Sequence, residues 1–215
     1  MGDGSINDVA AAAQLWSLGK ELEEGMTDRL NVVLLALVAV ALVATGCSKL
    51  GPANIHEALC TPAKQNPLDA VQSYLAKGGD PNLQNDVGQT PLLCATIEKH
   101  ADIVKLLLAK GANPNITDSL GQTPAFFAAY NQDVDIAGML INAGADVNAR
   151  TQSGEFALLR AVTWGHAGMV ELLINGGADV NMKPTDPRVP SPLKLAQDGQ
   201  MTEIVEMLKK AGATE

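Results

Sequence analysis

Residues 88–115, GQTPLLCATIEKHADIVKLLLAKGANPN, decide the fold of this chain, because their pattern returns along it. The stretch ends in a glycine-led phrase that closes on asparagine, and this phrase occurs four times. The closing asparagines are evenly spaced along the chain, at Asn82, Asn115, Asn148 and Asn181. Self-similarity at a fixed period of about 33 residues predicts a stacked array of short structural units.

Each unit carries the signals of two short helices. Thr90 can accept a hydrogen bond from a free N–H at a helix start, and Pro91, which lacks an N–H, fits the first turn. A second apolar run, residues 103–108, stops at the glycine of the next phrase, where a helix can end. Helices of roughly eight to ten residues are marginal alone in water, so stability must come from stacking of neighbouring units.

The opening of the stretch returns at residues 121–126 and, less completely, at 154–159 and 191–195. Together with the period, it resembles the Thr-Pro-Leu-His-x-Ala signature of the ankyrin repeat family. The resemblance covers residues 55–215 and implies an all-α repeat solenoid of about five units including caps, each a helix–turn–helix plus a hairpin-like loop. The motif histidine is replaced, so we expect local packing to take over from its polar contact at Leu93, Phe126, Leu159 and Lys194.

Two departures from the repeat occur near the end of the chain. Residues 182–190 contain two extra residues and three prolines, at positions 184, 187 and 190, which predicts a stiff, extended segment. This segment is either a tolerated surface insertion or part of a binding surface. The last unit of a repeat array needs a polar outer face, because no further unit covers it. Polar residues predict such a face here, at Gln200, Glu203, Glu206, Lys209 and Lys210.

An apolar run, residues 32–44, precedes the array and ends in Thr45-Gly46-Cys47. It is short for a membrane span, which needs about twenty apolar residues, and suits the core of a signal peptide. The ending resembles the lipobox of bacterial lipoproteins, which implies that Cys47 carries a lipid after cleavage. An uncleaved membrane anchor and a buried helix of a soluble protein are the alternatives.

The predicted organisation therefore has four parts. Residues 1–25 are an N-terminal extension, which is either translated or lies before a start at Met26. Residues 26–46 are the signal peptide, residues 47–54 are the lipidated cysteine with a short tether, and residues 55–215 are the ankyrin array. Ser48 follows the cysteine in place of an aspartate, and the lipoprotein resemblance then implies the periplasmic face of the outer membrane.

Charge and residue content argue against several functions. The chain has 15 basic and 24 acidic residues, and no basic stripe that would neutralise the phosphates of a nucleic acid. No phosphate-binding glycine loop, nucleophile elbow or zinc spacing is present, so we expect no enzymatic activity, cofactor or metal. Cys60 and Cys94 either form a disulfide or remain buried thiols.

The resemblance implies a protein partner, bound on the concave face by the loops and the ends of the first helices. Aromatic residues with a polar edge favour binding hot spots, but they can also simply cover helix ends against the next unit. We expect a monomeric protein that binds its partner through Tyr130, Trp164, Asn131, Ile97, Glu98, Thr163, Gln89, Gln122 and Glu155.

These observations predict a membrane-tethered protein-binding module of the bacterial envelope, either a scaffold or an adaptor. One alternative is an immunity protein or inhibitor of a secreted antibacterial toxin. Another is a host-directed ankyrin effector, which would require that the signal is not used as written.

Overall fold

The computed structural model describes Ile55 and residues 67–214 of the chain. The predictions for residues 1–25, 26–46 and 47–54, including the lipidation of Cys47, fall outside the described residues. None of the helices in the described part is long and apolar enough to cross a membrane.

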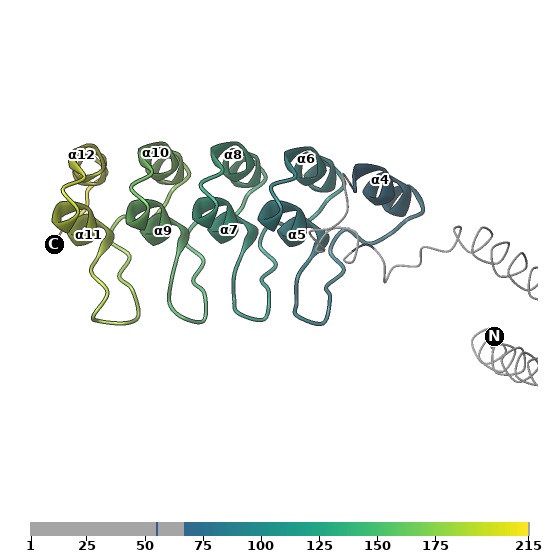
Figure 1. Ribbon diagram of the computed structural model, residues 1–215, viewed down its shortest axis with the longest axis horizontal. Helices are drawn as coiled ribbons and strands as arrows, with labels where there is room; N and C mark the ends of the chain where they lie inside the picture. The colour runs from purple at the N-terminus through teal and green to yellow at the C-terminus, as the bar shows by residue number, and fades with distance from the viewer. Residues whose placement is uncertain (1–54, 56–66, 215) are drawn as a thin grey trace, which may run out of the picture. The chain divides into compact units, whose positions relative to one another are not determined.

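The described residues form helical pairs that stack in a row, with a hairpin loop before each pair (Figure 1). Helices α5, α7, α9 and α11 lie between the loops and the row of second helices α6, α8, α10 and α12. First helices have seven residues, fewer than predicted, and second helices have nine. The all-α repeat solenoid is confirmed. Its described helices are α4 (Leu68–Ala76), α5 (Pro91–Ile97), α6 (Ala101–Ala109), α7 (Pro124–Tyr130), α8 (Val134–Asn142), α9 (Ala157–Thr163), α10 (Ala167–Asn175), α11 (Pro192–Asp198) and α12 (Thr202–Lys210).

The Thr-Pro pairs start the first helices as predicted. Thr90 Oγ1 accepts a hydrogen bond from Leu93 N at 3.2 Å, and Thr123 Oγ1 accepts one from Phe126 N at 3.2 Å. In the third unit Phe156 occupies this position and provides no cap bond, but its ring is fully buried. Burial of an aromatic ring therefore replaces the hydrogen bond at the start of α9.

The glycine of each phrase ends the preceding second helix. Gly111 has a φ of 84°. This is a left-handed conformation, which glycine adopts without a Cβ clash. Its N–H donates to Leu108 O at 3.1 Å, and Ala112 N donates to Leu107 O at 3.0 Å. Two carbonyls of the last turn of the helix are thereby satisfied.

A continuous apolar core runs along the array. One buried leucine from each second helix marks its period, at Leu107, Leu140, Leu173 and Leu208. The side chains that replace the motif histidine are also buried at Leu93, Phe126 and Leu159, as predicted, whereas Lys194 is exposed and pairs with Asp198 at 2.8 Å. The predicted polar surface of the last unit is likewise exposed.

The closing asparagines join each unit to the next. Asn115 Nδ2 donates to Gly144 O at 3.0 Å, and Asn115 Oδ1 accepts from Asp146 N at 2.7 Å. Only an amide side chain offers a donor and an acceptor in this arrangement, which explains the residue type. The same pair of bonds occurs at the other closing asparagines, Asn82, Asn148 and Asn181.

Neighbouring hairpin loops are held in register by backbone bonds. We number these loops first to fourth: residues 79–90, 112–123, 145–156 and 178–191. Ser119 N donates to Val87 O at 3.0 Å, and Gln152 N donates to Leu120 O at 2.9 Å. A Cβ atom at Gly88 would lie 2.9 Å from Ser119 N. Glycine therefore permits the close approach of the two loops.

The fourth loop corrects the prediction of an extended segment. Val189 N donates to Asp186 O at 3.0 Å, which closes a turn in the middle of the insertion. The guanidinium of Arg188 pairs with Asp186 at 2.7 Å and lowers the pKa of that carboxyl group. Arg188 N also donates to Asp186 Oδ1 at 2.9 Å. Aspartate commonly closes a turn in this way, which the prolines did not indicate.

Cys94 settles one of the open alternatives. It is buried at the start of the array and is disulfide-bonded. The chain contains only two other cysteines, Cys47 and Cys60. The alternative of a buried free thiol is therefore wrong for Cys94.

Candidate protein-binding surface

Tyr130 and Trp164 lie next to each other at the ends of two neighbouring first helices. Tyr130 is the last residue of α7, and Trp164 caps the end of α9. Their ring centroids are 6.4 Å apart and the planes meet at 87°. This edge-to-face arrangement is one that aromatic pairs prefer. The residues remain 45% and 52% exposed. The pair is thus oriented by its own contact while much of its surface faces solvent.

Arg160, on α9, supports the aromatic pair. Its guanidinium carbon lies 5.6 Å from the centroid of the Tyr130 ring and 6.0 Å from that of Phe126. Both distances are within range for cation–π attraction. Arg160 also forms an ion pair with Glu155. Within the described structure its Nε atom is buried and has no hydrogen-bond partner. Arg160 therefore holds the Tyr130 ring through a contact from the neighbouring unit.

Sequence reasoning missed Arg160, although a signal for it existed. It is the only charged residue in the helices α5, α7 and α9. A single charge in otherwise apolar or small-residue helices is costly unless it finds partners. Here the partners are an acidic residue from the preceding loop and aromatic rings from the neighbouring unit.

Asn131 follows Tyr130 in the chain, and its side chain bonds to the end of the first helix in the preceding unit. Its Nδ2 atom donates to Thr96 O at 3.3 Å and to Ile97 O at 3.2 Å, at the end of α5. This brings Asn131, Ile97 and Glu98 together, as half-buried residues at one level of the array. Thr163 is exposed next to Trp164, and its Oγ1 donates to Leu159 O at 2.7 Å.

The other three predicted residues lie at the opposite ends of the first helices. Gln89 and Gln122 are half-buried at the bases of their loops, where their N–H groups donate to Asn85 Oδ1 and Asp118 Oδ1 at 2.8 Å. Glu155 occupies the equivalent place and reaches Arg160. Glu155 is therefore the member of this group that the structure connects to the aromatic pair.

The tips of the first two hairpin loops expose aliphatic side chains that sequence reasoning did not select. Val87 is 51% exposed and Leu120 is 56% exposed, and they occupy equivalent positions in the repeat. In the third loop this position is Ser153. The signal for them was an aliphatic residue between a polar residue and the loop glycine, at Gly88 and Gly121.

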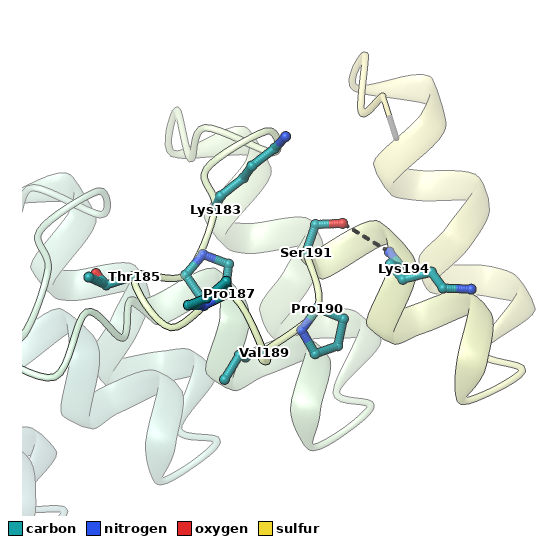
Figure 2. Close-up of a pocket in the computed structure, with 8 residues that line it drawn as sticks. Lys183, Thr185, Pro187, Val189, Pro190, Ser191 and Lys194 are labelled. Carbon is teal, nitrogen blue, oxygen red and sulfur yellow. Dashed lines mark hydrogen bonds between the residues drawn. The ribbon is translucent and has the colours of Figure 1, made fainter.

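The fourth loop borders an open hollow of about 550 Å³. Figure 2 shows Pro187, Val189 and Pro190 along the loop, and the hydrogen bond from Lys194 N to Ser191 Oγ that starts α11. Lys183 and Lys194 also line the hollow, and the ammonium group of Lys194 pairs with Asp198. The insertion in the fourth loop therefore contributes most of the residues that line this hollow.

The acidic residues and histidines of the described part form no candidate metal site. No group of three or more histidine, cysteine, aspartate or glutamate side chains there could hold a metal ion. His166 Nδ1 accepts a hydrogen bond from Met169 N at 3.0 Å and so caps α10, and His100 lies at the corresponding start of α6. Asp133 likewise caps α8.

Stacked helical pairs with projecting hairpin loops define a repeat solenoid, a class that presents a long surface and has no enclosed site. Residues 56–151 match the family model described as ankyrin repeats (3 copies), and residues 153–184 match the model described as ankyrin repeat. The chain belongs to the ankyrin repeat family. Proteins of this family are generally non-enzymatic modules for protein–protein interaction. The search of the curated proteins gave no match.

Proposed function

We propose that this protein is a membrane-tethered protein-binding module of the bacterial envelope, which binds a protein partner through its first helices and hairpin loops. In ankyrin arrays these elements form the concave face. The observation that carries the proposal is the half-exposed pair of Tyr130 and Trp164, held in place by Arg160.

The aromatic pair has the properties of a binding hot spot. Tyrosine and tryptophan offer a large contact area with few rotatable bonds and a polar atom at the edge, and they dominate many protein interfaces. The contact between the rings and the cation–π contact fix the side chains before binding, so less conformational entropy is lost when a partner docks. If the rings served only to cover helix ends, burial would be more complete than it is.

The proposed tether rests on the resemblance to a lipobox at residues 43–47. A short segment, residues 48–54, separates Cys47 from the array. A chain of that length spans at most about 25 Å, which would keep the array near the membrane surface. The disulfide at Cys94 supports export, because such bonds persist in oxidising compartments such as the periplasm. We place the protein on the periplasmic face of the outer membrane and expect it to be monomeric.

Affinity capture from envelope extracts tests the proposed binding function. We expect the native protein to retain a partner that the double variant Tyr130→Ala/Trp164→Ala does not retain. Each single substitution should weaken binding to the purified partner by about 1 to 4 kcal/mol, with little change in the thermal midpoint. Lys105→Ala, an exposed position on α6, is the matched control and should bind normally.

Two results of this experiment would redirect the proposal. Equal capture by the double variant and the native protein would contradict binding at the aromatic pair. Capture of a secreted toxin whose activity is then blocked would favour the immunity-protein alternative over a scaffold.

A further inference from the structure

We infer that the tips of the first two hairpin loops form a second contact with the same partner, and that this part of the partner carries aliphatic side chains next to lysine or arginine. The inference rests on the proposed function, which supplies the partner but not its chemistry. Two observations support it. Two aliphatic side chains are exposed at the loop tips, and the loops carry carboxylate groups whose negative charge the fold does not require.

The fold does not need the side chains of Val87 and Leu120. Each loop is held in register through backbone atoms of these residues, namely their carbonyl groups, which accept from the next loop. Their side chains are more than half exposed, and Ser153 occupies the same position in the third loop. Aliphatic side chains that face solvent at neighbouring loop tips contribute stabilising free energy only when another surface covers them and removes them from water.

Two aspartates of these loops have structural roles that asparagine also performs in this chain. Asp80 Oδ1 accepts from Asn82 N at 2.8 Å, and Asn113 Oδ1 accepts the equivalent bond from Asn115 N at 3.0 Å. Asp146 and Asp179 accept the same bond in the third and fourth loops. The example of Asn113 shows that the fold requires an oxygen acceptor here but no negative charge.

The same comparison holds at the second loop. Asp118 Oδ1 accepts from the N–H groups of Leu120 and Gln122, at 2.9 and 2.8 Å. Asn85 Oδ1 accepts the corresponding bonds in the first loop, at 3.1 and 2.8 Å. The fold therefore does not require the negative charge of Asp118 or that of Asp80. Asp86, an exposed aspartate next to Val87, is a third carboxylate in these loops.

Among these four loops, acidic residues without a lysine or arginine in the same loop occur only in the first two. The first and second loops contain Asp80, Asp86 and Asp118 and no lysine or arginine. The third and fourth loops contain acidic residues together with cations. The acidic residues are Asp146, Glu155, Asp179 and Asp186, and the cations are Arg150, Lys183 and Arg188. A partner segment with aliphatic and cationic side chains therefore complements the first two loops better than the last two, where the cations of this chain would repel it.

Peptide binding to the full-length protein tests the partner chemistry. One labelled peptide alternates lysine with leucine, a second alternates glutamate with leucine, and fluorescence anisotropy reports binding of each. We expect the lysine peptide to bind about tenfold more tightly, since several exposed charge pairs of modest strength add together. Asp80→Asn/Asp86→Asn/Asp118→Asn should abolish this preference, and Val87→Ser/Leu120→Ser should weaken the binding of the lysine peptide.

A second triple variant controls for net charge. Asp135→Asn/Glu171→Gln/Glu203→Gln removes the same charge from exposed positions on α8, α10 and α12. It should leave the preference for the lysine peptide intact. Equal losses in the two triple variants would show that net charge alone attracts the peptide and would overturn the inference.

The captured partner separates this inference from the proposed function. If binding depends on Tyr130 and Trp164 but not on either loop variant, the inference fails and the proposed function stands. If neither set of substitutions affects capture, both fail. If the loop variants instead change the sedimentation of the protein alone, a second copy of this chain covers the loop tips and the inference is overturned.

Discussion

Three residues between the paired helices hold a backbone conformation that is costly for any residue with a Cβ atom. Lys99, Gln132 and Gln200 have φ values of 60°, 59° and 55°, and Gly165 occupies the same position in the third unit with φ 64°. The turn persists because the next residue donates back into the first helix, as Asp133 N does to Ala128 O at 3.0 Å. The strain is therefore imposed by the packing of each helical pair.

Replacing Gln132 by glycine should relieve this strain. Left-handed backbone costs about 1 kcal/mol for a residue with a side chain, and the greater flexibility of glycine in the unfolded chain offsets part of the gain. Gln132 is exposed, so few contacts are lost. We expect Gln132→Gly to raise the free energy of unfolding by about 0.5 kcal/mol, measured by urea denaturation. A lower stability would contradict this account, and Gly165→Ala should be destabilising.

The closing asparagines make a second prediction at this scale. Asn148 Nδ2 donates to Gly177 O at 3.0 Å, and its Oδ1 accepts from Asp179 N at 2.7 Å. Asn148→Ala removes both bonds between the third and fourth units and should cost about 1 to 3 kcal/mol. Denaturant unfolding measures the loss. Asn142→Ala, at an exposed position at the end of α8, provides the comparison and should cost much less.

At the scale of the elements, each second helix contributes one leucine to the core at the same point of the repeat. Leu107 on α6 is completely buried, as are Leu140 and Leu208. Such a position cannot be emptied without leaving a cavity, because the helices on both sides are fixed by their own neighbours.

Leu107→Ala should lower the free energy of unfolding by about 2 to 5 kcal/mol through this cavity. The measurement is a denaturation curve of the purified array. Leu120→Ala removes the same atoms from an exposed loop tip and should change stability by no more than about 0.5 kcal/mol. Similar values for the two variants would mean that the repeat register is wrong.

The helices could be predicted because their signals are local. Thr90 and Pro91 mark a helix start within two residues, and Gly111 marks the end of a helix by itself. The repeat period of about 33 residues then predicted the positions of the later helices. Local signals also explain the error in the fourth loop, where prolines suggested extension but Asp186 accepts hydrogen bonds from the backbone N–H groups of Arg188 and Val189 and closes a turn.

The candidate site was predicted less completely because its contacts join different units. Tyr130 and Trp164 stood out as rare residue types at one level of the repeat. The cation–π contact of Arg160 depends on the packing of α9 against α7, which no spacing within one helix reveals. The pairing of adjacent loops, which leaves Val87 and Leu120 exposed, likewise depends on the distance between neighbouring units.

At the scale of the whole molecule, the proposed tether and the array are separate in their physical roles. A lipid-modified cysteine would supply membrane attachment, while stacking of the repeats supplies stability. Neither role requires the other.

Cys47→Ser should therefore move the protein from the membrane fraction to the soluble fraction without unfolding the array. Incorporation of labelled palmitate, followed by fractionation, measures attachment, and circular dichroism measures helical content. Ser48→Ala, next to the cysteine, should remain attached and labelled. Membrane association of the Cys47 variant, or absence of label in the native protein, would contradict the proposed lipidation.

The bonds of the closing asparagines also bear on how such a protein can change over generations. Each asparagine reaches only the following unit, and the bonds at Asn115 and Asn148 are made to equivalent atoms. A tandem duplication of the gene segment encoding residues 116–148 would recreate both junctions with their partners in place. The array can thus lengthen by whole repeats through one genetic event, and each added repeat brings another copy of Tyr130 to the row of first-helix ends.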